Sequence, residues 1–132
     1  MKITVDTNVL VRLAVRDDEN QWRAAAKALE NAELIAISLS CLCEMVWVLK
    51  GFYRFGQEEI SKILYSLLNA GNVVMNRAAV EAGLAILEAG GDFADGAIAY
   101  EGRWMGGDTF VSFDKKAVAL VDKQGQQAQL LS

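Results

Sequence analysis

Two aspartates in this chain directly follow short runs of strand-forming residues and precede helical patterns. Asp6 follows the β-branched run at residues 3–5, and Asp114 lies just beyond the run at residues 109–112. Runs of this kind predict strands. In open α/β sheets, ligands bind at the carboxyl ends of the strands. Asp6 and Asp114 are therefore candidates for a site at that edge.

Glu44 is the only charged residue in the otherwise apolar or hydroxyl-bearing stretch at residues 34–49. A carboxylate in such a setting costs several kcal/mol unless it is paired or bound to a metal. Two alternatives stay open. Its helix face is exposed to solvent at that turn, or it pairs with an arginine such as Arg12 or Arg103.

Asp95 lies one turn inside a predicted helix that opens at Asp92, so both side chains fall on the same side of that helix. Capping is a strong alternative for Asp6, Asp92 and Asp114, because aspartate is a favoured N-cap residue. Taken singly, each of the three is explained by capping. The recurrence of acids at one edge favours a shared site that includes Asp95.

Four carboxylates without histidine or thiolate partners form a hard-oxygen site that suits Mg²⁺ or Mn²⁺ rather than zinc. The chain contains no histidine, which excludes histidine-based acid/base and triad chemistry. Metal-assisted hydrolysis of a phosphodiester fits such a cluster. A phosphohydrolase of the haloacid dehalogenase type would require a second aspartate at position 8, where Asn8 stands.

The elements that must position these acids alternate between strands and helices. This alternation predicts an α/β fold, a three-layer sandwich with a mostly parallel central sheet of about five strands flanked by helices. The predicted strands are 3–5, 34–37, 73–75, 109–112 and 128–131, and the predicted helices are 7–13, 19–31, 38–53, 57–69, 77–89, 92–104 and 114–121.

The length of 132 residues predicts one domain over residues 1–132, and a content of 53% hydrophobic residues excludes a disordered chain. The net charge of −4 gives no general affinity for nucleic acid, so an RNA substrate would require a local basic rim. Cys41 and Cys43 lie two apart in a predicted helix and cannot pair, which favours a reducing compartment. No signal peptide or bilayer-spanning segment is visible, and we expect a cytoplasmic protein without a membrane partner.

Four stretches in order resemble the PIN-domain ribonucleases, and within them the VapC-type toxins of toxin–antitoxin pairs. They are ITVDTNVL at residues 3–10, the lone Glu44, DFADGAIA at residues 92–99 and FVSFDKK at residues 110–116. Each stretch alone is a weak signal, whereas four in the same order are specific. The resemblance covers essentially the whole chain.

The resemblance implies that Asp6, Glu44, Asp95 and Asp114 are the catalytic residues and form one acidic pocket for Mg²⁺ or Mn²⁺. Asp6 and Asp95 would bind the ion directly, and Glu44 and Asp114 through water or a second ion. Thr7 would orient the pocket through its hydroxyl, although helix capping explains Thr7 equally well.

The resemblance also implies the partners, namely an RNA substrate, a cognate antitoxin protein and a second copy of the chain in a homodimer. The alternative is a catalytically silent PIN-like module whose acidic pocket binds a basic partner segment. A basic rim and an aromatic cluster are candidates for contacts with these partners, although solvated surface and packing of the helical hairpin are the competing interpretations. The rim comprises Arg12, Arg16, Lys50, Arg54, Lys115 and Lys116, and the cluster comprises Trp47, Phe52, Tyr53 and Phe55.

Overall fold

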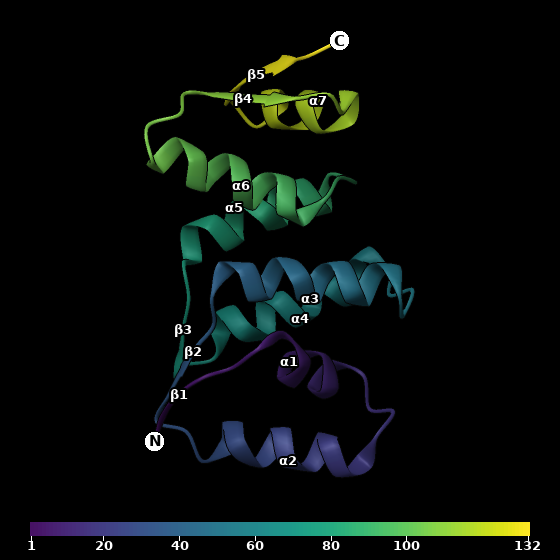
Figure 1. The fold of residues 1–132 in the computed structure, drawn as a ribbon, viewed down its shortest axis with the longest axis vertical. Helices are drawn as coiled ribbons and strands as arrows, with labels where there is room; N and C mark the ends of the chain where they lie inside the picture. The colour runs from purple at the N-terminus through teal and green to yellow at the C-terminus, as the bar shows by residue number, and fades with distance from the viewer. The chain divides into compact units, whose positions relative to one another are not determined.

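The computed structural model describes all residues from 1 to 132 and divides into two compact units, 1–76 and 77–132. Figure 1 shows the elements of each unit, which are described separately below. The prediction of a single domain over the whole chain stays a prediction.

The first unit contains three strands and four helices. In chain order these are β1 (Lys2–Thr4), α1 (Thr7–Ala14), α2 (Glu19–Glu30), β2 (Leu34–Ala36), α3 (Leu39–Gly51), α4 (Gln57–Asn69) and β3 (Val73–Val74). The strands form one parallel sheet in the order β1-β2-β3, with Ile3 opposite Ile35 and Ile35 opposite Val73. Parallel pairing requires the helical crossovers that the alternating sequence predicts.

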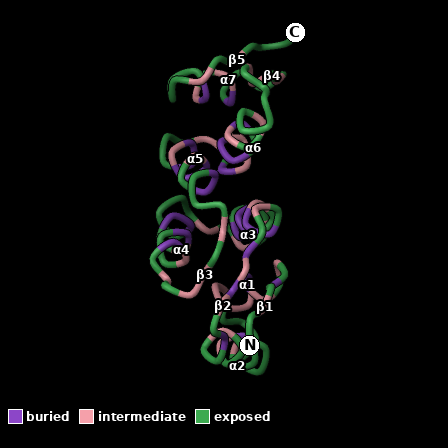
Figure 2. Tube along the Cα trace, turned by 90° about the vertical axis from the view of Figure 1, so that its left-hand side faces the viewer, coloured by how far each residue is buried: buried purple, intermediate pink, exposed green.

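Helices α3 and α4 contribute several fully buried side chains to the core of the first unit. Leu42, Met45 and Leu49 of α3 and Ile60 and Leu64 of α4 are fully buried, and Figure 2 shows the buried positions along these helices. Their spacing of three or four residues places them on one side of each helix. This packing gives the residues of α3 a fixed position.

The second unit contains two strands and three helices. They are α5 (Arg77–Glu88), α6 (Phe93–Trp104), β4 (Thr109–Ser112), α7 (Lys115–Lys123) and β5 (Gln127–Leu130). Strands β4 and β5 pair in parallel, with Phe110 opposite Ala128. Ile86 of α5, Ala99 of α6 and Val121 of α7 form a buried cluster that joins the three helices.

The predicted α/β fold with parallel strands is confirmed. Every predicted helix and strand is present, and the observed ends differ from the predicted ones by at most two residues. All observed strand pairs are parallel, in a three-stranded sheet in one unit and a two-stranded sheet in the other. None of the helices combines the length and hydrophobicity that a bilayer-spanning helix requires.

Helices α5 and α6 approach each other closely where each carries a glycine. A Cβ atom on Gly83 would lie 2.6 Å from the ring of the buried Phe93, and one on Gly96 would lie 2.5 Å from the carbonyl oxygen of Ala82. Real side chains do not tolerate such distances, so these glycines permit the close crossing. Gly96 directly follows Asp95, so this crossing also positions the candidate acid.

We predict that Gly96→Ala lowers the free energy of unfolding by about 1–3 kcal/mol, because the added methyl group forces α6 away from α5. Gly102→Ala is the matched control in the same helix, since a Cβ there meets nothing within 4 Å. That change should raise stability by about 0.5–1 kcal/mol, as alanine is the better helix former. Urea unfolding of both variants checks this pair, and equal stability would contradict the close crossing.

Candidate active site

Asp6 lies two residues after β1 and caps α1. Its Oδ1 accepts a hydrogen bond from the backbone N–H of Val9 at 3.2 Å, and its side chain is exposed. The predicted position beyond the carboxyl end of a strand is therefore confirmed, and so is the capping role. Because the cap bond uses one oxygen, the other oxygen is free to contact a ligand.

Glu44 lies in the second turn of α3 and is exposed, as the first of its two alternatives predicts. The second alternative, a pairing with Arg12, is not what the structure shows. The Nη1 atom of Arg12 donates instead to Oδ1 of Asp17 at 3.0 Å and to the hydroxyl of Tyr53 at 3.3 Å. Helix α3 thus presents an acid at its surface while its other face packs in the core.

The charges of both candidate acids of the first unit, Asp6 and Glu44, act on Cys41. Its side chain is buried one turn before Glu44, and its thiol shares a hydrogen bond with the hydroxyl of Thr7. Burial raises the pKa of this thiol, and the negative charges of Asp6 and Glu44 raise it further, while the bond with Thr7 lowers it. Asp6 and Glu44 therefore both lie close enough to act on the same group.

Sequence reasoning did not assign a role to Cys41 beyond its failure to form a disulfide with Cys43, and no disulfide joins the two. The available signal was its position three residues before Glu44, on the same side of a helix. The Thr7 hydroxyl, expected to orient the pocket, has this buried thiol as a partner. That bond ties the start of α1 to α3.

Three aspartates of the second unit lie near one another. Asp92 caps α6 by accepting from the backbone N–H of Ala94 at 3.3 Å. Asp114 caps α7, and its Oδ1 accepts from the backbone N–H groups of Lys116 at 2.9 Å and Ala117 at 3.1 Å. Asp95 caps nothing and lies half-buried in the first turn of α6.

The environment of Asp95 disfavours its charge. Burial raises the pKa of its carboxyl group, and the negative charges of Asp92 and then Asp114 raise it further. Like charges gathered around a half-buried carboxylate are unusual for a merely structural cluster. A bound cation would relieve this repulsion.

The charges of Asp6 and Glu44 thus both act on Cys41 in the first unit, and those of Asp92 and Asp114 both act on Asp95 in the second. No three or more carboxylates and thiols converge closely enough to enclose a metal ion. The donor chemistry nevertheless fits Mg²⁺ or Mn²⁺, because every candidate ligand is a carboxylate oxygen. A single pocket built from all four predicted acids stays a prediction.

The four residues of the aromatic cluster differ in their exposure to solvent. Trp47 and Phe52 are 73% and 76% exposed, so packing does not account for most of their surface. Tyr53 and Phe55 are half-buried, and the Tyr53 ring meets that of Phe52 edge to face at 4.9 Å. Packing of the helical hairpin therefore explains only the second pair.

Two residues of the predicted basic rim form ion pairs within the protein. Arg12 pairs with Asp17, as described above. Arg16 pairs with Glu19 at 2.8 Å, and its guanidinium lies 3.6 Å from the centre of the Trp22 ring. The other four residues of the rim are exposed lysines and an arginine.

The PIN domain family model matches residues 3–123. The chain belongs to the PIN domain family. PIN domains are generally nucleases that depend on divalent metal ions, so the chain has a nuclease-type fold. No curated protein matches the chain.

We predict that Asp95→Asn raises the free energy of unfolding at pH 7 in the presence of EDTA. The folded-state pKa of Asp95 lies above its unfolded value, so the charged carboxylate destabilises the folded state at neutral pH. This cost falls as the pH drops through the folded-state pKa and vanishes below the unfolded value of about 3.9. Urea unfolding at pH 7 and pH 4 should show a gain that shrinks in acid.

Glu101→Gln provides the control, because it neutralises an exposed acid of the same helix. It should change stability by no more than about 0.5 kcal/mol at either pH. An Asp95→Asn protein that is less stable than the wild type at pH 7 would show that this carboxylate is stabilised rather than repelled by its surroundings.

Proposed function

We propose that this PIN-domain protein is an endoribonuclease that depends on Mg²⁺ or Mn²⁺ and hydrolyses RNA phosphodiester bonds. The observation that carries the proposal is the half-buried Asp95, held beside the two further negative charges of Asp92 and Asp114. Such an arrangement is costly without a cation and favourable with one. Because the chain belongs to a family of nucleases, we expect this cation to take part in phosphodiester hydrolysis.

In this proposal Asp6 and Asp95 bind the ion directly, and Glu44 and Asp114 act through water or at a second ion. A divalent ion held by these carboxylates would lower the pKa of a bound water and neutralise charge on the phosphate. The caps on Asp6 and Asp114 fix the direction of each carboxylate before any ligand binds. With no histidine in the chain, proton transfer falls to carboxylates and water.

Cleavage of a mixed RNA pool by the purified protein tests the proposal, with Mg²⁺ or Mn²⁺ compared with EDTA. We expect metal-dependent cutting, and a loss of about 100-fold or more for each of Asp6→Asn, Glu44→Gln, Asp95→Asn and Asp114→Asn. Changes to residues that only hydrogen-bond to a metal ligand already cost about 10- to 100-fold. Asparagine caps a helix as well as aspartate does. The loss in Asp6→Asn would therefore report the charge and not the fold.

Asp18→Asn is the matched control for Asp6→Asn. Asp18 caps α2 through the backbone N–H of Gln21 at 3.1 Å, as Asp6 caps α1, but it is not a candidate ligand. Its activity should equal that of the wild type. A folded wild-type protein that neither cuts RNA nor binds Mn²⁺ would favour the silent module whose acids receive a basic partner segment.

We further propose that the chain is the toxin of a type II toxin–antitoxin pair, acts as a homodimer, and is inhibited by an antitoxin that carries a basic segment. The exposed acids Asp6, Glu44 and Asp114 and the net charge of −4 would attract such a segment. The exposed Trp47 and Phe52 offer apolar contact area for a protein partner.

Expression in a bacterial host should arrest growth with the wild type and Asp18→Asn, but not with Asp6→Asn. Colony counts and growth curves measure the effect. Co-expression of a small neighbouring gene product with a DNA-binding amino-terminal half should restore growth. If the wild type cuts RNA in vitro but leaves growth unchanged, the protein has a stand-alone role in RNA processing instead.

A further inference from the structure

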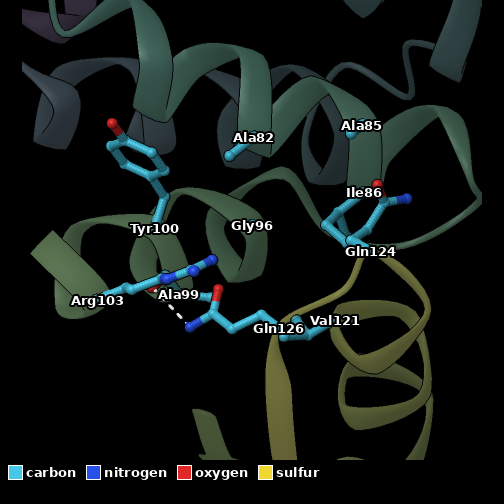
Figure 3. Close-up of a pocket in the computed structure, with 10 residues that line it drawn as sticks. All are labelled: Ala82, Ala85, Ile86, Gly96, Ala99, Tyr100, Arg103, Val121, Gln124 and Gln126. Carbon is cyan, nitrogen blue, oxygen red and sulfur yellow. Dashed lines mark hydrogen bonds between the residues drawn. The ribbon is translucent and has the colours of Figure 1, made fainter. Parts of the chain in front are cut away.

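A small pocket of about 180 Å³ lies among α5, α6 and the segment that follows α7, entirely within the second unit. Its floor is formed by small and apolar residues, including Ala82, Ala85 and Ile86 of α5. Figure 3 shows polar side chains around this floor. The remaining lining residues are Gly96, Ala99, Tyr100, Arg103, Val121, Gln124 and Gln126.

The polar side chains are placed there by local sequence. Tyr100 and Arg103 follow Gly96 by four and seven residues, so the three share one face of α6. Gly125 adopts a φ of +92° after α7, which turns the chain and brings Gln126 to the pocket. Gln126 donates from Nε2 to the carbonyl oxygen of Ala99 at 3.1 Å, as the dashed line in Figure 3 marks.

With this hydrogen bond formed, the side chains of Gln126, Arg103 and Gln124 still offer hydrogen-bonding groups to a ligand. The Oε1 atom of Gln126 is an acceptor, because its amide nitrogen is the donor to Ala99. Arg103 adds a fork of N–H donors, and Gln124 adds a second amide. In Figure 3 the ends of the Arg103 and Gln126 side chains lie next to each other on one side of the pocket, and Gln124 lies beside Ile86 on the other side.

A flat neutral ring with polar edges matches these walls better than an anion does. Small apolar residues and the Tyr100 ring suit the faces of such a ring, and the arginine and the two amides suit its edge. One arginine above an apolar floor is a poor match for a phosphate, which would lose its hydration there. The volume is below the roughly 300–1,000 Å³ of pockets for drug-sized ligands, which fits a single ring system.

We propose that this pocket binds one unstacked base of the RNA substrate, with Arg103 reading its carbonyl edge, and that guanine is preferred. Arginine binds O6 and N7 of guanine in a bidentate manner, whereas adenine presents a donor at that position. The pocket shares a helix with one candidate acid, because Ala99 lines it and lies one turn after Asp95 in α6. Because the pocket would determine the base specificity of RNA cleavage, this proposal rests on the proposed nuclease function.

The test begins without cleavage, by titrating the isotope-labelled, metal-free protein in EDTA with GMP, AMP, ribose 5-phosphate or inorganic phosphate. We expect GMP to shift the backbone amide NMR signals of Gly96, Ala99 and Gln126. AMP should bind more weakly, and the two compounds without a base should leave these signals in place. Arg103→Gln should weaken GMP binding by about tenfold, since a bidentate arginine contact discriminates by roughly 5- to 150-fold.

Lys123→Gln is the matched control, since it removes one positive charge from the end of α7 outside the pocket lining. It should bind GMP as the wild type does. Ala85→Leu fills the floor and should abolish the shifts, and its amide spectrum reports whether it is folded. Equal shifts with ribose 5-phosphate or phosphate would overturn the proposal in favour of an anion site, and the absence of shifts with GMP would overturn it outright.

Sequencing of the RNA products then separates the two proposals. Wild type and Lys123→Gln should cut with the same base preference, whereas Arg103→Gln should still cut in a metal-dependent manner with that preference relaxed. An unchanged preference in Arg103→Gln overturns the pocket assignment alone. Persistent cleavage by Asp6→Asn overturns the proposed nuclease chemistry, while the GMP titration still decides whether the pocket binds a base.

Discussion

Mutual repulsion between carboxylates is the constraint on which the candidate site depends. Carboxylates that lie close together repel one another, so other groups have to hold each of them in position. Backbone N–H groups at helix starts do so for Asp6, Asp92 and Asp114, each of which accepts from the first turn of its helix. The positive end of the helix dipole adds to this stabilisation. Capping and chemistry are therefore compatible roles, because a capped carboxylate keeps one oxygen free and a fixed direction.

Asp95 is the exception, because the tight α5–α6 crossing rather than a cap determines its position. It has no cap to hold it, so its position depends on α6, whose neighbouring Gly96 packs against the backbone of Ala82. A larger residue at position 96 would displace the helix and the acid together. The repulsion around Asp95 is offset by packing elsewhere in the unit, including the fully buried Phe93. Function-related strain of this kind is commonly balanced by well-packed surroundings.

Sequence alone predicted the elements well because most of them have strong periodic patterns and clear caps. The run Leu34–Ala36 has no polar alternation, as a covered parallel strand requires, and Ser38 marks the start of α3. The candidate acids were found because Asp6 and Asp114 follow strands. Cys41 was missed because a buried thiol has no distinctive spacing, and its contact with Thr7 joins segments 34 residues apart in the chain.

The pocket beside α6 was missed for the same physical reason. Its walls come from three separate segments, and alanines that form a floor look in sequence like any helix-favouring residues. Only the packing of α5 against α6 shows that the small side chains leave space. Helix α6 therefore contributes to two surfaces, an acidic one that includes Asp95 and a pocket wall that includes Tyr100 and Arg103. Because Ala99 lies four residues from Asp95 and three from Gly96, any change that moves this helix alters both surfaces together.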